Sequence, residues 1–184
     1  ADIKKFFYVF FGRLFFNVGI YDQSSIPKDL QDKGWAVGDD WQVAMIILGA
    51  ASSGKSTLVN FVIEILGTDR VARMDANMEE QFGVSYLMGK DVCVCSEMRA
   101  KMNLPQHVFQ DMVSGAEISA AVKHKNPVTQ KFLSQLFMVG NQLPDWRDAS
   151  GSVPRRFALF RFNKSALGGK QDCELILNLL AELP

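Results

Sequence analysis

Neither sign of charge dominates this chain. Its 20 Lys and Arg residues balance 20 Asp and Glu residues, so the formal net charge at pH 7 is zero. A chain without excess positive charge is not drawn as a whole to nucleic acid. Any binding to nucleic acid must therefore come from a local basic site.

Cysteine is also scarce, with only Cys93, Cys95 and Cys173. The number is odd, no spacing typical of a metal site is present, and the first two lie in an apolar run as small core residues. This usage argues against a disulfide framework and predicts a reducing, intracellular location.

No apolar run is long enough to cross a membrane. Residues 6–21 are rich in aromatics, but Arg13 and Asn17 interrupt them, and no small-residue cleavage site follows. We predict a packed amphipathic helix over residues 2–18 with its Phe side chains buried. The chain begins Ala-Asp, and we expect it to be a piece of a longer protein.

The most informative stretch runs from Val43 to Leu66. An apolar run, 43–48, leads into a glycine-containing loop, and apolar residues then recur at helical spacing until Gly67. The loop matches the phosphate-binding pattern G-x-x-x-x-G-K-[ST] in its strand–loop–helix setting. The predicted nucleotide-binding residues are Gly49, Ala50, Ala51, Ser52, Ser53, Gly54, Lys55, Ser56 and Thr57.

Each position of this loop has a physical role. Gly49 and Gly54 let the backbone turn tightly, so that successive N–H groups converge on a phosphate beside the positive end of a helix. Lys55 supplies charge for the β- and γ-phosphates, and Ser56 offers a hydroxyl to Mg²⁺. ATP and Mg²⁺ are therefore the predicted ligands.

The remaining pattern alternates short apolar strands with helices, which predicts an α/β fold whose mainly parallel sheet is covered on both faces. Residues 19–40 read as a polar connector. The predicted strands are 71–74, 91–95, 136–139 and 157–162, and 117–122 with 128–132 form a hairpin whose turn holds Pro127. Further helices are predicted over 77–88, 105–113 and 172–183.

Two polar residues follow predicted strands. Glu97 ends the strand 91–95 and suits a general base or, through water, a Mg²⁺ ligand; the alternative is an ordinary surface acid. Asn141 follows the strand 136–139 and suits a contact to the γ-phosphate or the attacking water. The alternative for Asn141 is a turn residue in Gly-Asn.

Two basic clusters carry further hypotheses. Arg155 and Arg156 open the last strand, and one of them could reach a neighbouring subunit's γ-phosphate; the alternative is a solvated strand start. Lys123, His124 and Lys125 form the hairpin tip, which could contact nucleic-acid phosphates or be an ordinary charged turn.

Taken together, the chain resembles the helicase domain of superfamily 3, the AAA+ type of viral and mobile-element replication proteins. Phe11-Gly12-Arg13-Leu14-Phe15, Asp40-Trp41-Gln42-Val43 and the phosphate loop resemble the large DNA virus and phage branch, related to poxvirus-type primase-helicases. Val94-Cys95-Ser96-Glu97, Gly140-Asn141-Gln142-Leu143-Pro144 and Pro154-Arg155-Arg156-Phe157 resemble the second motif, the third motif with its sensor Asn, and the arginine-finger segment. Lys123-His124-Lys125-Asn126-Pro127-Val128 is similar to the papillomavirus helicase hairpin.

This resemblance implies a P-loop NTPase of the AAA+ type, a three-layer sandwich with an inserted β-hairpin. It divides the chain into an N-terminal helix and connector (1–40), an ATPase core (41–165) and a C-terminal helix (166–184). The implied assembly is a homo-hexameric ring that hydrolyses ATP at subunit interfaces and pulls single-stranded DNA through its centre. A primase or origin-binding domain in the full-length protein is a further implied partner, in the host cytoplasm or nucleus.

The same resemblance assigns roles to single residues. Lys55 and Ser56 contact phosphate and Mg²⁺, Glu97 is the catalytic acid and Asn141 the sensor. Arg156 is favoured as the finger with Arg155 in reserve, and Lys123 with His124 contacts DNA.

Three other functions compete with this hypothesis. An RNA-directed viral helicase shares the motifs, although the branch-specific stretches argue against it. A small-molecule kinase usually carries an arginine-rich lid, which is not seen in this sequence. A P-loop ATPase acting as a nucleotide-dependent assembly module has less need of Glu97.

Overall fold

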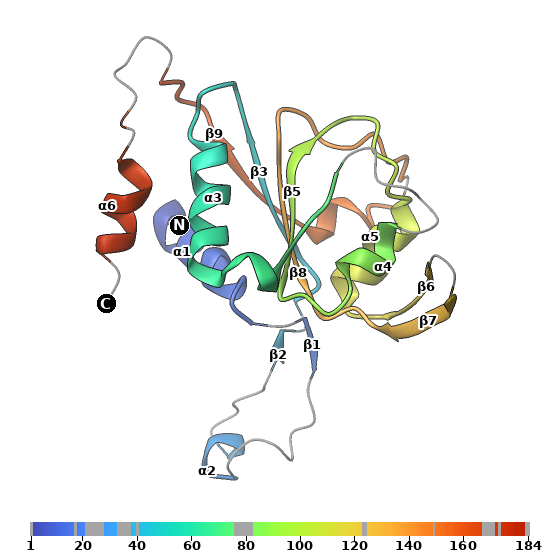
Figure 1. Ribbon diagram of the computed structural model, residues 1–184. Coiled ribbons are helices and arrows are strands. Elements are labelled where there is room, and N and C mark those ends of the chain that lie inside the picture. The colour runs from blue at the N-terminus through green and yellow to red at the C-terminus, as the bar shows by residue number, and fades with distance from the viewer. Residues whose placement is uncertain are drawn as a thin grey trace.

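A five-stranded parallel sheet forms the centre of the molecule (Figure 1). The computed structural model describes residues 2–16, 18–20, 28–32, 38–39, 41–75, 83–122, 125–148, 150–166, 172 and 174–182. The strands are β3 (Ala44–Gly49), β4 (Val71–Arg73), β5 (Val92–Met98), β8 (Gln135–Gly140) and β9 (Phe157–Phe162). Their order is β4-β5-β8-β3-β9, and every neighbouring pair is parallel. The predicted α/β class with a mainly parallel sheet is confirmed.

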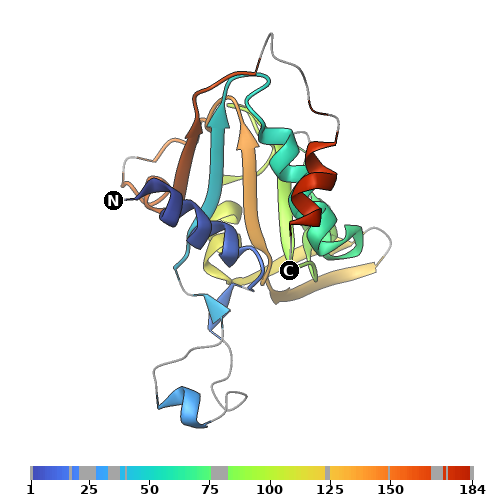
Figure 2. The same ribbon diagram turned by 90° about the vertical axis from the view of Figure 1, so that its left-hand side faces the viewer.

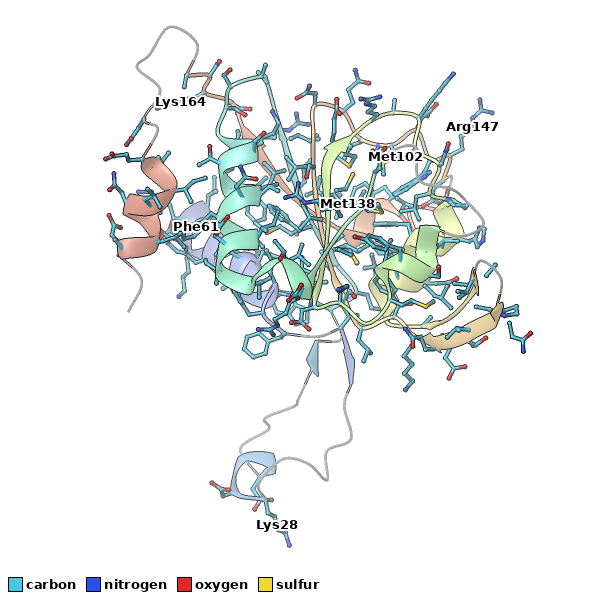
Figure 3. All side chains as sticks on the ribbon, in the orientation of Figure 1. Lys28, Phe61, Met102, Met138, Arg147 and Lys164 are labelled. Atoms are coloured by element: carbon cyan, nitrogen blue, oxygen red, sulfur yellow. The ribbon has the colours of Figure 1, made fainter. Side chains whose placement is uncertain are left out.

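Both faces of this sheet are buried, as its continuous apolar strands require. On β3, Ile46 and Leu48 join one core cluster, whereas Met45 and Ile47 join the other. The helices α4 (Gly83–Leu87) and α5 (Gln106–Ser114) cover the first face, and α1 (Ile3–Arg13) and α3 (Lys55–Leu66) cover the second (Figures 1 and 2). Met138 of β8 lies in the interior between these layers (Figure 3).

The helix α1 only partly fulfils the prediction for its phenylalanines. Phe10 is buried, but Phe6 is 56% exposed and Phe16, just beyond the helix, is 64% exposed. A helix lying on a sheet turns a single stripe toward the core, so phenylalanines at other angles face solvent. Phe7 and Phe11 are half-buried, with ring centroids 5.3 Å from Phe160 and 6.2 Å from Phe61, respectively.

The described parts of the predicted connector 19–40 contain three short elements. Strands β1 (Gly19–Ile20) and β2 (Gly38–Asp39) pair antiparallel, and α2 (Lys28–Gln31) lies beyond them (Figure 1). The Val18 amide donates to the Leu133 carbonyl at 2.8 Å, which joins the start of this segment to the core.

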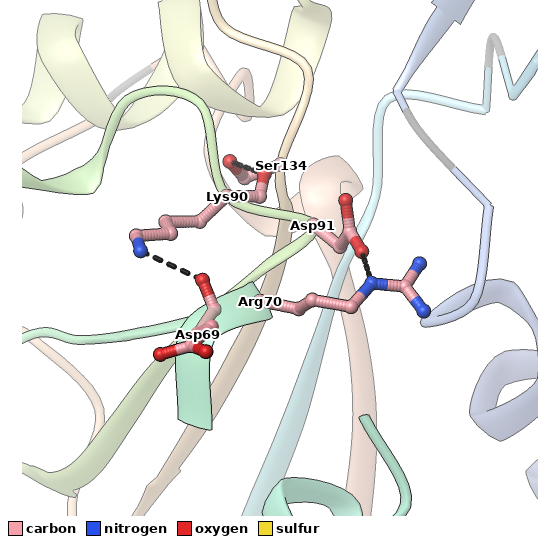
Figure 4. Close-up of polar contacts among 5 residues, drawn as sticks. All are labelled: Asp69, Arg70, Lys90, Asp91 and Ser134. Atoms are coloured by element: carbon pink, nitrogen blue, oxygen red, sulfur yellow. Dashed lines mark hydrogen bonds and ion pairs between the residues drawn. The ribbon is translucent and has the colours of Figure 1, made fainter. Parts of the chain in front are cut away.

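Polar contacts join the starts of β4, β5 and β8 (Figure 4). The Lys90 ammonium donates to the Asp69 carbonyl at 2.7 Å, and the Arg70 guanidinium pairs with the Asp91 carboxylate. The buried Ser134 hydroxyl donates to the Lys90 carbonyl. Since these residues immediately precede the three strands, the contacts fix where each strand enters the sheet.

The predicted hairpin is present as β6 (Glu117–Val122) and β7 (Lys125–Lys131), which pair antiparallel. Pro127 lies inside β7 rather than in the turn, which corrects the prediction. Proline has no N–H to donate and is tolerated on edge strands, and both strands of a two-stranded sheet are edges.

Two other boundaries differ from prediction. Ser96 and Glu97 belong to β5 instead of following it, and the pairing of β5 with β8 shifts register between Cys95 and Met98. Arg155 and Arg156 lie in a 3-10 turn, Pro154–Arg156, rather than opening the strand β9. The proline starts this turn because its fixed φ suits the first helical position.

The predicted helix 105–113 is found as α5, shifted by one residue, whereas the predicted helix 2–18 is found as the shorter α1. Of the predicted helix 77–88, the structure describes α4, while residues 76–82 lie outside the described residues. The C-terminal helix α6 (Leu175–Ala181) lies beside α3 and buries none of its own residues. Among the described residues, no helix combines the length and hydropathy that a membrane crossing needs.

Candidate active site

The loop between β3 and α3 has the backbone geometry expected of a phosphate cradle. Gly54 is the N-cap of α3 and has φ +88°, in the left-handed region that side chains rarely adopt. Ser52 also lies in this region, with φ 57°. Two left-handed residues so close together curl the chain tightly before α3, whose first amides have no partner within the helix.

Gly49 is needed for space rather than for turning. Its φ is not in the left-handed region, but a Cβ there would lie 2.6 Å from the Phe162 carbonyl oxygen and 2.7 Å from Ser53 Oγ. The expectation that Gly49 supplies backbone freedom is thus corrected: it lets the start of the loop pass against the end of β9.

The side chain of Lys55, the first residue of α3, lies back across the loop between β3 and α3. Its ammonium donates to the carbonyl of Gly49 at 2.8 Å, to the carbonyl of Ala50, and to Ser53 Oγ at 3.4 Å. The side chain is half-buried, whereas Ser56 in the first turn of α3 is exposed. These contacts hold a positive charge at the mouth of the loop, where the positive end of the helix dipole adds to it.

The segment after β9 braces the same loop. Ser165 Oγ donates to the Ala51 carbonyl at 3.1 Å, and the Ala166 amide donates to the Ser52 carbonyl at 2.8 Å. The loop is therefore held from both sides, by Lys55 and by the chain beyond the sheet.

The parallel sheet brings Glu97 and Asn141 to the edge that carries the loop. The strands β3, β8 and β5 are neighbours and end at the same edge, so residues at their carboxyl ends gather there. Both side chains are exposed. A Cβ on Gly140 would lie 2.8 Å from Met98 Cβ and closer still to the Met98 carbonyl, so these two strand ends approach each other tightly.

Glu97 has a partner that sequence reasoning missed. Arg99 Nη2 lies 2.9 Å from Glu97 Oε2, and the Glu97 side chain is 72% exposed. Such an exposed ion pair contributes little to the stability of the fold. Because most of its side chain is exposed, Glu97 remains accessible to solvent. Arg99 directly follows β5. Its positive charge, two positions after Glu97, was the sequence signal that could have predicted this ion pair.

A second acid at this edge was also overlooked. Asp75 follows β4, and its charge is one cause that raises the pKa of Cys95, after burial of that thiol. Its position directly after the predicted strand 71–74 is the same signal that singled out Glu97.

Arg155 and Arg156 lie at the opposite end of the sheet from the loop. Phe157, the residue that follows them, pairs with Ala44, whereas Gly49 pairs with Phe162. Five residues of strand separate these pairs, a distance of about 16 Å. The two arginines are thus placed away from the β3–α3 loop of their own chain.

The two arginines have different surroundings. Arg156 Nη1 donates to the Ser152 carbonyl at 2.6 Å, and among the described atoms its buried Nε has no hydrogen-bond partner. Burial, with a smaller contribution from the neighbouring Arg155, lowers the pKa of Arg156. Arg155 is exposed.

The structure describes only part of the segment that was predicted to bind DNA. Lys123 and His124 lie outside the described residues, and of Lys125 only the backbone position in β7 is described. The strands β6 and β7, which precede and follow Lys123 and His124 in the sequence, pair antiparallel.

The residues at the loop edge fit Mg²⁺. No cluster of three or more His, Cys, Asp or Glu is found among the described residues. Mg²⁺ held on a nucleotide needs only one or two protein oxygens, since phosphates and water complete its octahedron. The exposed Ser56 hydroxyl and Glu97 carboxylate are oxygen donors of this kind.

Residues 47–156 match the model of a protein family described as a family of unknown function (DUF5906). This match spans more than half of the 184 residues. The chain belongs to this family. No curated protein matches it in sequence.

Solved structures share the fold. The apo structure of the NrS-1 C-terminal region is 20% identical with a TM-score of 0.58, over 78% of this chain and 35% of that one. The JCV helicase, solved with a small molecule bound, is 18% identical with a TM-score of 0.53, over 76% of this chain and 41% of that one. The chain therefore has a helicase-like fold and spans well under half the length of either structure.

Proposed function

We propose that this chain is the ATPase motor domain of a replicative DNA helicase that works as a homo-hexameric ring. In this proposal it belongs to the AAA+ type of superfamily 3, in the large DNA virus and phage branch. The observation that carries the proposal is the division of the site. The phosphate loop, Glu97 and Asn141 lie at one edge of the sheet, and the arginine pair lies at the other.

This division favours a shared site over a complete one within a single subunit. Phosphoryl transfer needs positive charge against the γ-phosphate, which an arginine supplied by a neighbour can provide. The two arginines lie too far from their own loop for that role, about 16 Å along the sheet. In a ring, each subunit would present them to the loop of the next.

Within the site, Lys55 binds the β- and γ-phosphates and the amides before α3 cradle them. Glu97 accepts a proton from the attacking water, and Asn141 orients that water or the γ-phosphate. Ser56, with Glu97 through water, would hold Mg²⁺, which when bound neutralises charge on the phosphate oxygens. Arg99, whose Nη2 lies 2.9 Å from Glu97 Oε2, holds the Glu97 side chain at this end of the sheet.

The hairpin β6–β7 is the proposed contact to single-stranded DNA, through Lys123, His124 and Lys125. Six copies of a small basic tip can line a pore without giving the subunit a net positive charge. This is consistent with the formal net charge of zero.

ATP hydrolysis with and without single-stranded DNA tests the proposal. We expect hydrolysis by the wild type, stimulation by DNA more than by RNA of the same sequence, and loss of hydrolysis in Glu97→Gln with ATP binding retained. Glu64→Gln is the matched control, because Glu64 is an exposed acid on α3 outside the proposed machinery. Hydrolysis by Glu97→Gln at the wild-type rate would remove Glu97 from the mechanism.

A further inference from the structure

A single carboxylate organises the loop that precedes the arginine pair. Asp148 Oδ1 accepts hydrogen bonds from the Ser150 amide at 2.9 Å and from Ser150 Oγ at 2.6 Å. Asp148 Oδ2 accepts from Ser152 Oγ at 3.0 Å and from the Val153 amide at 2.6 Å. The side-chain bond from Ser150 and the backbone bond from Val153 hold the pKa of Asp148 well below its usual range. The carboxylate therefore stays ionised at neutral pH.

This loop is attached to the protein on two sides. Gln110 Nε2 of α5 donates to Ser152 Oγ at 2.7 Å, and Val153 is buried in the core. The Ser152 carbonyl accepts from Arg156 Nη1 at 2.6 Å. Asp148 thus reaches Arg156 through one residue, Ser152, and the backbone that leads into the 3-10 turn is fixed at both ends.

The same contacts separate the two arginines. Arg156 is held inside its own subunit by Ser152 and by the nearby negative charges of Asp111 and Asp148. Arg155 is exposed, and among the described residues no side-chain hydrogen bond or ion pair restrains it. Of the two side chains, only that of Arg155 is therefore free to extend toward another subunit.

We propose that Asp148 is a positioning residue whose carboxylate fixes the loop that holds Arg156 in its own subunit. Arg155 is then the arginine presented to the neighbouring subunit. This inference rests on the proposed function. It moves the finger role from Arg156, which the sequence resemblance favours, to Arg155. Asp148 touches neither nucleotide nor metal and acts through the backbone of 150–153.

The kinetic test compares Asp148→Ala with Asp145→Ala in the full-length protein. Asp145 is an exposed acid three residues away, and only its backbone amide has a described contact, to the Ala100 carbonyl. We expect Asp148→Ala to lower the kcat for ATP by about 10- to 100-fold, because displacing a catalytic group by about 1 Å costs up to about 100-fold. The KM for ATP should change less than threefold, and Asp145→Ala should match the wild type. An unchanged kcat in Asp148→Ala would overturn the proposal.

Subunit mixing separates positioning from a folding defect. We mix Lys55→Ala 1:1 with Asp148→Ala, or with Arg155→Ala, before assembly on single-stranded DNA. Each protein alone should be inactive or nearly so. Each active interface in a mixed ring needs an intact Lys55 from the Asp148→Ala or Arg155→Ala subunit and an intact arginine from a Lys55→Ala neighbour. With random 1:1 assortment, about a quarter of the interfaces have this arrangement. Recovery toward a quarter of wild-type activity is expected for both pairs.

Three results would contradict the inference. Failure of Asp148→Ala to recover on mixing would mean that its defect lies in its own site or its own folding. Wild-type activity of Arg155→Ala, with a complemented loss in Arg156→Ala, would return the finger role to Arg156. The third result applies if Asp148→Ala does not fold, and it uses Asp148→Asn, which keeps the size and one carbonyl acceptor. A wild-type kcat in Asp148→Asn, or a reduced kcat that mixing does not restore, would then contradict the inference.

The proposed function fails in a different way. If the wild type does not hydrolyse ATP, or if Lys55→Ala hydrolyses it normally, the motor assignment is wrong whatever Asp148 does. If the wild type is active and Lys55→Ala is inactive, the mixing experiment reports on Asp148 and Arg155 alone.

Discussion

Replacing Gly140 by alanine tests how closely β5 and β8 meet at the candidate site. The added Cβ would lie 2.8 Å from Met98 Cβ and even nearer to the Met98 carbonyl. Carbon atoms in contact normally lie about 3.5–4.0 Å apart, so the two strand ends must separate by about 1 Å. Most of this conflict is with backbone, which cannot rotate away.

The cost follows from this geometry. Overpacking of a well-packed site costs about 1–3 kcal/mol, and the stiffer unfolded chain of an alanine variant returns up to about 1 kcal/mol. We therefore expect a net loss of about 1–2 kcal/mol in the free energy of unfolding. For a domain of this size, each kcal/mol lowers Tm by about 2–4 °C, so Tm should fall by about 2–8 °C.

Thermal unfolding followed by circular dichroism measures this change. Gly12→Ala is the matched control, because Gly12 lies in the last turn of α1 with no atom within 4 Å of an added Cβ. Alanine is the better helix former, so Tm should rise by about 1–4 °C in that variant. A Tm for Gly140→Ala equal to or above that of the wild type would refute the reasoning.

Three more predictions concern the loop, the hairpin and the thiols. Lys55→Ala should weaken ATP binding at least about tenfold, measured with a fluorescent ATP analogue, since it removes a charge-assisted contact. Lys123→Ala with His124→Ala should weaken single-strand binding in an anisotropy titration but spare basal hydrolysis. Burial raises the pKa of Cys93 to about 12 and that of Cys95 to about 11, so at most one of three thiols should react with Ellman's reagent at pH 8 until the protein unfolds. Because these folded-state pKa values exceed the unfolded ones, the two thiols stabilise the fold less as the pH rises above about 9. Thermal unfolding measured against pH checks this, since Tm should fall less steeply above about pH 9 in Cys93→Ala than in the wild type.

The parallel sheet and the position of the loop between β3 and α3 were predictable from local patterns. The apolar runs in β3, β5 and β8 are too short for helices, which predicted buried strands, and in the structure these apolar runs are buried. The helix α5 was found because Pro105 and Gly115 mark its ends, and Gly115 indeed has φ +69°.

Features that depend on contacts between distant segments were not predictable. Pro127 was placed in the turn because a proline disfavours a central strand, and the sequence does not reveal that β6 and β7 form a sheet of two edges. The role of Asp148 arises from bonds within an irregular loop and from Gln110, 42 residues away from Ser152. No periodicity marks such contacts.

Of the candidate site, the sequence indicated which residues gather at the loop edge but not how they are held. Parallel strands end at one edge, so Glu97 and Asn141 were predicted from their places after buried strands, whereas the strand order came from the structure. The pairing of Glu97 with Arg99 and the different exposure of Arg155 and Arg156 required coordinates.

ATP hydrolysis measured against protein concentration, with and without single-stranded DNA, tests the central claim most directly. The full-length protein is used, so that any neighbouring domain needed for assembly is present. The account predicts that specific activity rises steeply with concentration and that DNA stimulates it, because each site needs an arginine from a second subunit. Specific activity that is flat with concentration and indifferent to DNA would contradict a shared site and with it the ring-motor proposal.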